Sequence, residues 1–166
     1  MGRGSVVFLA AGVGAWLGAM VFVSFVVAPT AFSILESRHQ AGAMVAAALN
    51  ILYLTGYILG PLLVLVSVVS PPPGGRLLWG ARTILLILIS VSTIVSREFV
   101  GAKLSSLRRA MGVIIEKVPP DDPLRLLFQQ WHQISVFLMI FNILAASAVL
   151  VLLFREVRGR GAYIIR

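Results

Sequence analysis

The sequence predicts an all-α integral membrane protein: an antiparallel four-helix transmembrane bundle with an amphipathic helix between spans three and four. Of the 166 residues, 59% are hydrophobic and 12% are charged, and the mean hydropathy is +0.99. Soluble domains typically contain roughly 45–50% apolar and about 25% charged residues, so a water-soluble globule could not bury this much apolar surface. The length suits about four spans of ~20 residues with short connections, which predicts a single membrane domain over residues 1–166.

The first two spans are predicted by long apolar runs. The first run covers about residues 6–32 and is far longer than the roughly 7–15-residue core of a signal peptide, so we expect a retained span. The second run covers about residues 41–69. It ends at Ser70, where three prolines and two glycines follow, and this sequence cannot continue a helix.

The last two spans are separated by a longer connection. The third run covers about residues 77–97 and ends at a charged pair, whereas the fourth covers about residues 123–154. Asp122 can cap this last helix, and Pro123 suits its first position. The pattern over about residues 101–118 predicts an amphipathic helix, which either lies on the membrane surface or extends the third span. Its apolar positions recur at helical spacing: Leu104, Leu107, Met111, Ile114 and Val118.

The charges indicate the topology and the surroundings. Four spans place both termini and the proline-rich loop on one side of the membrane. The chain has 14 Lys+Arg against 6 Asp+Glu, but these basic residues stand mostly at the ends of apolar runs. There they meet lipid headgroups, so we expect contact with membrane lipids and none with nucleic acid. Seven Lys and Arg fall on each side, and Arg3 with the basic C-terminal tail favours cytoplasmic termini.

Enzymatic chemistry is not expected from this composition. The chain has no cysteine, which excludes disulfides, thiolate metal sites and cysteine nucleophiles. Two histidines leave little for a high-affinity transition-metal site. The sequence also has no phosphate-binding glycine loop, zinc-binding helix motif or serine nucleophile elbow. We therefore expect no enzyme activity, no bound metal and no tightly bound cofactor.

Polar side chains within the spans form the candidate site, because in hydrocarbon such groups normally face the bundle interior. Asn50 follows His39 by eleven positions, and Asn142 follows His132 by ten. This predicts both amides about 15 Å from the same interface, near the midplane, where they could hydrogen-bond to each other. They serve either as structural links or as a ligand or ion site. The full candidate set is Asn50, Tyr53, Tyr57, His132, Ser135 and Asn142.

A charged cluster is predicted at the interface opposite the termini, at the level of His132. It consists of Glu36, His39, Arg97 and Glu98. These groups could form a proton relay, a metal-binding mouth or a salt-bridged plug, or they could simply anchor the spans. In the first span, Gly14-x-x-x-Gly18 predicts a close helix contact, within the bundle or between copies.

The chain resembles a known family in short motifs spread over nearly its whole length. From Gly18 to Phe32 it reads Gly-x-x-x-Phe-x-x-Phe-x-x-Ala-Pro-x-x-Phe, and Ala41-Gly42 opens the second span. Phe128-x-x-x-His132-x-x-Ser135 follows in the fourth span. These motifs resemble the four-span transmembrane protein 205-like family, whose bacterial members form a domain of unknown function, and more loosely the copper-resistance D membrane domain. The resemblance implies transport or trafficking.

Together these observations predict a small non-enzymatic membrane protein, transport- or permeation-related, with a polar midplane site. One alternative is an accessory subunit packed against a larger membrane complex, or a homo-oligomer. A second is a haem- or copper-binding membrane protein, in which His39 and His132 would be the haem ligands. We expect it in a bacterial inner (plasma) membrane.

Overall fold

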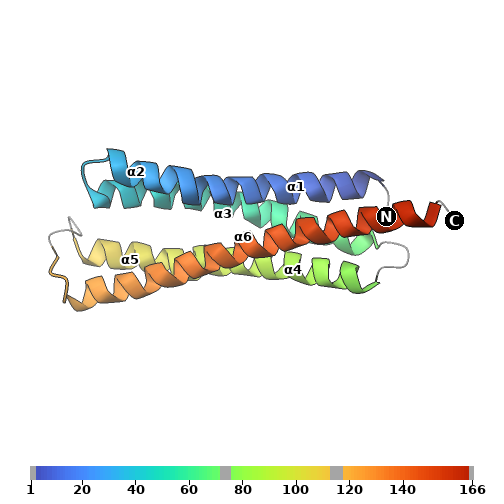
Figure 1. The fold of residues 1–166 in the computed structure, drawn as a ribbon. Helices are drawn as coiled ribbons and strands as arrows, with labels where there is room; N and C mark the ends of the chain where they lie inside the picture. Colours follow the sequence, from blue (N-terminus) through green and yellow to red (C-terminus); the bar gives the residue numbers. More distant parts are fainter. Residues whose placement is uncertain (1–2, 72–75, 113–117, 165–166) are drawn as a thin grey trace.

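A computed structural model describes residues 3–71, 76–112 and 118–164, and it confirms the predicted all-helical bundle (Figure 1). The four helical rods run alternately in opposite directions, and both termini lie at the same end. Four helices are long and apolar enough to cross a membrane: Gly4–Ile34, Arg38–Val69, Arg76–Ala110 and Pro123–Arg158. The chain is therefore a small integral membrane protein.

The first two rods are joined by a short turn. The first comprises α1 (Arg3–Phe22), the π-helical segment η1 (Val23–Val27) and α2 (Ala28–Ile34). Pro29 cannot donate to the carbonyl four residues earlier, and the wider π-helical turn lies directly before it. The second rod is α3 (Arg38–Val69), which begins where the Ser37 hydroxyl accepts a 3.1 Å hydrogen bond from the Gln40 amide.

The third rod is longer than its apolar run. It comprises α4 (Arg76–Val95), the π-helical segment η2 (Ser96–Gly101) and α5 (Ala102–Ala110). The amphipathic helix thus extends the third span, and Gly112, with φ +78°, follows its end. Residues 113–117 of the predicted helix lie outside the described residues.

The fourth rod is α6 (Pro123–Ile164). The predicted cap is confirmed, since Asp122 Oδ1 accepts from the amides of Leu124 at 2.8 Å and Arg125 at 3.3 Å. Helix α6 continues ten residues beyond the expected end at Phe154. Hydropathy falls there, but the basic tail contains no proline to stop the helix.

Apolar stripes from all four rods form the core. On α1 the buried positions Leu9, Val13, Trp16 and Met20 recur at helical spacing and meet buried residues of α3, α4 and α6. The main packing runs from α1 to α3, α3 to α4, α4 to α6 and α6 to α1. Helices α3 and α6 therefore lie diagonally across the bundle.

The closest helix approach uses different glycines from the predicted pair. A Cβ atom added at Gly56 would lie 2.5 Å from Trp16 Cζ2, and one at Gly60 would lie 2.6 Å from Ser90 Oγ. Added Cβ atoms at Gly14 and Gly18 would have no neighbour within 4 Å. The Gly14-x-x-x-Gly18 motif thus makes no close contact inside the bundle, because the buried stripe of α1 runs through Val13 and Trp16 instead.

The bundle divides into two helix pairs at the end opposite the termini. There α2 packs on α3, whereas α5 packs on α6. Figure 1 shows these two pairs diverging at that end. This divergence makes room for the candidate site.

Candidate functional site

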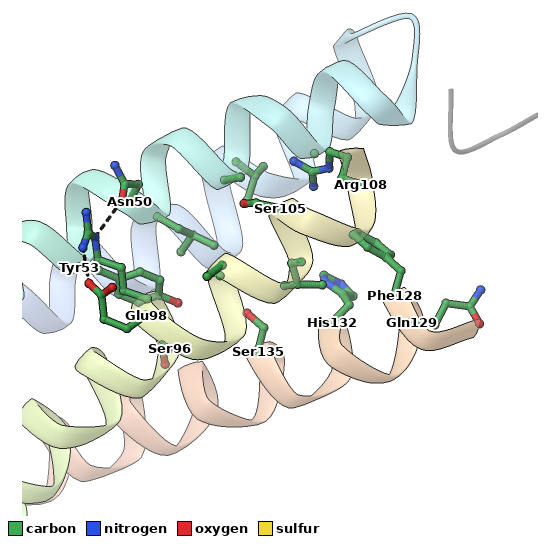
Figure 2. A pocket seen from close by; sticks show the side chains of 18 of the residues that line it. Asn50, Tyr53, Ser96, Glu98, Ser105, Arg108, Phe128, Gln129, His132 and Ser135 are labelled. Atoms are coloured by element: carbon green, nitrogen blue, oxygen red, sulfur yellow. Dashed lines mark hydrogen bonds and ion pairs between the residues drawn. The ribbon is translucent and has the colours of Figure 1, made fainter. Parts of the chain in front are cut away.

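A pocket of about 560 Å³ lies between the two diverging helix pairs. Its walls come from the first half of α3, from η2 and α5, and from the first half of α6, with Phe32 contributed by α2. Figure 2 shows Asn50 and Tyr53 from α3, Ser105 and Arg108 from α5, and Phe128 and His132 from α6 around the same space. The volume falls within the roughly 300–1,000 Å³ range of small-molecule sites.

The structure brings four of the six candidate polar residues to this pocket. Asn50, Tyr53, His132 and Ser135 line it, although they come from two diagonal helices. The Tyr53 hydroxyl lies near the side chains of Ser96 and Ser135. Ser96 is buried, and its Oγ has no hydrogen-bond partner at normal distance. This group gives the pocket a polar inner end.

Tyr57 belongs to a polar cluster beside the pocket. Its hydroxyl donates a 2.5 Å hydrogen bond to Glu98 Oε1, and the Arg97 guanidinium lies 5.3 Å from its ring centre. Arg97 also forms an ion pair with Glu98 and donates from Nε to Asn50 Oδ1 at 3.0 Å. Arg97 and Glu98 stand in η2, where the wider helical turn carries both toward α3. The two charges therefore neutralise each other at the rim of the pocket.

The two amides do not form the predicted pair. Asn50 is exposed and bonds to Arg97, whereas Asn142 is 1% exposed in the core and its Oδ1 has no partner. Asn50 lies 12 residues into α3 and Asn142 lies 19 residues into α6, a difference of about 10 Å along the bundle. The prediction was wrong because α6 begins nine residues before His132, so the two histidines do not mark the same depth.

The predicted cluster of four charged residues also separates. Arg97 and Glu98 line the pocket, but Glu36 lies in the α2–α3 turn and His39 in the first turn of α3, both outside the pocket lining. The buried Nδ1 of His39 has no hydrogen-bond partner. Helix continues for 13 residues beyond Arg97, about 20 Å, which moves this residue away from the α2–α3 turn.

His132 and Arg108 meet Phe128 at the outer end of the pocket. The rings of Phe128 and His132 are stacked, with centres 6.3 Å apart and an angle of 2° between their planes. The Arg108 guanidinium lies 5.8 Å from the Phe128 ring centre and is half-buried. Gly42 gives it room, since a Cβ added there would lie 3.2 Å from Arg108 Nη2.

Counting helical residues from the apolar ends near the termini places the pocket nearer to the opposite membrane boundary than to the midplane. About 20 helical residues cross the hydrocarbon core. Counting from the end near the termini, each span therefore reaches the other boundary about 20 residues away. The paired positions are Val69 and Asn50, Leu77 and Arg97, and Phe154 and Ile134. The pocket-lining residues stand at this boundary and beyond it, because α3 alone is about 48 Å long.

Sequence reasoning missed several residues of the pocket. Arg108 falls in the predicted amphipathic helix, but its place opposite α3 depends on the divergence of the two helix pairs. Gly42 opens the second span in the sequence, but its neighbour Arg108 lies 66 residues away along the chain. The charged lining residues that were not selected are Arg38, Arg108 and Arg125.

A buried ion pair at the opposite end of the bundle was also missed. Arg82 Nη1 lies 2.5 Å from Glu156 Oε2, and the two residues are 0% and 7% exposed. Arg82 Nε donates to Ser67 Oγ at 3.1 Å, which ties α3 to α4 and α6. The available signal was a charged residue inside an apolar run, which in a membrane span marks a specific buried role.

Residues 11–112 match the model of a family described as a domain of unknown function, DUF4149. The chain belongs to this family. The matched region extends from α1 to just past α5, so it includes Gly42, Asn50, Arg97 and Arg108 but not the α6 side of the pocket. No curated protein and no solved structure shows a significant match to the chain.

Proposed function

We propose that the protein is a non-enzymatic, transport- or permeation-related membrane protein that takes up its cargo in the interfacial pocket. The observation that carries this proposal is the partly polar pocket of about 560 Å³ between the two diverging helix pairs. Four of the sequence-selected polar residues line it. The resemblance to the transmembrane protein 205-like family supports the same kind of role.

Polar atoms deeper in the bundle support movement beyond the pocket. Ser96 stands at its inner end, and Ser92 lies one turn further along α4. The Ser92 Oγ and Asn142 Oδ1 atoms are buried without a partner. Buried polar atoms are usually satisfied by a protein group or by ordered water, so these two atoms leave hydrogen-bonding capacity inside the bundle. They do not line the pocket, but they add polar groups to the core beyond its inner end.

Two alternative functions differ in how well the structure supports them. The side of α1 at Gly14 and Gly18 is open, which suits close packing of another helix, so an accessory subunit or a homo-oligomer is the second candidate. Haem or copper binding has weaker support, because His132 lines the pocket and His39 does not. Within the described residues, no three His, Asp or Glu side chains are placed to hold a metal ion.

Native mass spectrometry of the gently extracted full chain tests the proposal. We expect small-molecule adducts that are lost in Ala46→Trp, which fills the pocket, and kept in Ala47→Trp, an exposed neighbour that does not line it. A stoichiometric protein partner without a pocket-bound molecule would support the accessory-subunit alternative instead.

A further inference from the structure

The charges around the pocket are strongly one-sided. Among the residues that the structure describes, the pocket lining contains four arginines and one glutamate. Glu98 is engaged by Arg97, and the Arg125 guanidinium donates to the Val118 carbonyl at 2.5 Å. Cationic groups therefore exceed anionic groups in a space that is partly shielded from water, where an anion is attracted more strongly than at an open surface.

Arg108 is the cation best placed to receive an anion. Neither ion pair formed among the described residues, Arg82–Glu156 or Arg97–Glu98, involves it. Its Nε atom is buried and has no hydrogen-bond partner. A half-buried guanidinium with an unsatisfied donor is suited to a carboxylate or phosphate, since its planar N–H groups match those oxygens.

The rest of the pocket is suited to hydrocarbon. Phe32 and Leu49 on one side and Leu104 and Phe128 on the other provide an apolar wall next to Arg108. The pocket also stands at the membrane boundary, where amphiphiles place their charged groups. A small inorganic anion would leave this wall uncovered, whereas an acyl chain would cover it.

We propose that the pocket binds an anionic amphiphile, with its carboxylate or phosphate on Arg108 and its acyl chain against the apolar wall. This inference rests on the proposed function, since it names the ligand class of the same pocket. Gly42 is a positioning residue, because a larger side chain there would displace the guanidinium. The anionic group could come from a free fatty acid or from a lipid headgroup, and these sources share the same binding chemistry.

Protection of a single cysteine tests this proposal. The chain has no native cysteine, so Ser105→Cys places one thiol in the pocket and Ser106→Cys places one on the same helix outside it. Maleimide labelling is followed in neutral detergent, with palmitate, palmitoyl lysophosphatidate, monopalmitin or inorganic phosphate added. A saturating ligand at ten times its Kd should slow labelling of Ser105→Cys about tenfold.

We expect protection by palmitate, by lysophosphatidate or by both, and none at Ser106→Cys. Protection by palmitate alone identifies a free carboxylate, and protection by lysophosphatidate alone identifies a phosphate headgroup; both results support the proposal. Adding Arg108→Ala should abolish protection, whereas the exposed neighbour Arg109→Ala should leave it unchanged. Arg108→Lys keeps the charge and should protect partly, which covers the case in which Arg108→Ala does not fold.

If monopalmitin or inorganic phosphate protected Ser105→Cys as well as palmitate or lysophosphatidate does, the proposed ligand class would be wrong. Equal effects of Arg108→Ala and Arg109→Ala would also overturn it, since that result indicates general charge attraction. If Ser105→Cys labels readily but none of the four compounds protects it, the ligand class is wrong while the pocket remains open to another cargo. If Ser105→Cys labels only after denaturation, the pocket is closed and the proposed function fails as well.

Discussion

The buried pair Arg82–Glu156 gives a prediction at the scale of single residues. Arg82→Met leaves the Glu156 carboxylate in the core without the guanidinium, so we expect a loss of about 3–5 kcal/mol in the free energy of unfolding. The double variant Arg82→Met/Glu156→Leu should recover most of this loss, because it removes both charges. Arg155→Met, an exposed neighbour, is the control. SDS-induced unfolding in detergent micelles gives the unfolding free energies of the wild type and the three variants. If Arg82→Met and the double variant were equally stable, the argument would be contradicted.

Asn142 gives a second prediction at this scale. Its Oδ1 is buried without a partner, so Asn142→Leu removes an unsatisfied acceptor while roughly keeping the side-chain volume. We expect a change in unfolding free energy of no more than about 1 kcal/mol. Adduct binding in the pocket should persist, because Asn142 does not line it, whereas any passage through the bundle should slow. A variant with unchanged stability and unchanged transport would remove Asn142 from the polar route.

Single residues also show where sequence reasoning succeeded. Asn50, Tyr53, His132 and Ser135 were selected because polar groups in apolar helices face inward, and all four line one pocket. Arg108 could not be selected in the same way. Its helix is amphipathic in sequence, and only the packing of α5 on α6 turns this arginine toward α3.

At the scale of helices, the contrast among glycines is testable. Gly56→Ala would place a Cβ 2.5 Å from Trp16 Cζ2 and 2.9 Å from Thr93 Cγ2, so α1 or α4 must shift. We expect a loss of about 1–3 kcal/mol in unfolding free energy. Gly18→Ala is the matched control: it meets open space and should be neutral or stabilising by up to ~1 kcal/mol. Thermal unfolding of both variants measures the two changes in stability. Equal losses of stability in Gly56→Ala and Gly18→Ala would mean that α1 turns a different face toward α3.

The helices show how far hydropathy predicts their ends. The start of α6 was predicted from Asp122, because a side-chain cap is local in sequence, and α3 begins at a similar cap on Ser37. The third span was expected to end at Arg97, yet the helix runs on to Ala110. Apolar runs mark the part of a helix that lipid surrounds, while the helix itself continues until a breaker such as Gly112 intervenes.

At the scale of the whole molecule, the pocket occupies only one end of the bundle. Both termini and the Arg82–Glu156 pair lie at the other end, where α3, α4 and α6 are tied together. Packing is therefore tight near the termini and open between the helix pairs at the far end. The number of spans followed from composition and length, whereas this asymmetry depends on contacts between residues far apart in sequence.

The topology of the bundle determines which leaflet can supply a ligand to the pocket. With cytoplasmic termini, the pocket and Asp121, which precedes α6, face the opposite side of the membrane. A membrane-impermeant maleimide on intact cells should then label Asp121→Cys, and it should label Gly4→Cys and Arg155→Cys only after permeabilisation. All three positions are exposed, and Asp122, which caps α6, is left in place.

The labelling pattern separates the fold from its orientation. Opposite accessibility of Gly4→Cys and Arg155→Cys would contradict the four-span bundle, because an even number of spans returns the chain to its starting side. If Gly4→Cys and Arg155→Cys label on intact cells and Asp121→Cys does not, the four-span bundle is correct but its orientation in the membrane is the reverse of the expected one. The equal number of Lys and Arg on the two sides makes the N-terminal and C-terminal charges decisive, so adding two lysines beside Asp121 should favour that reversed orientation. The anionic amphiphile would then have to come from the cytoplasmic leaflet, where anionic lipids are concentrated.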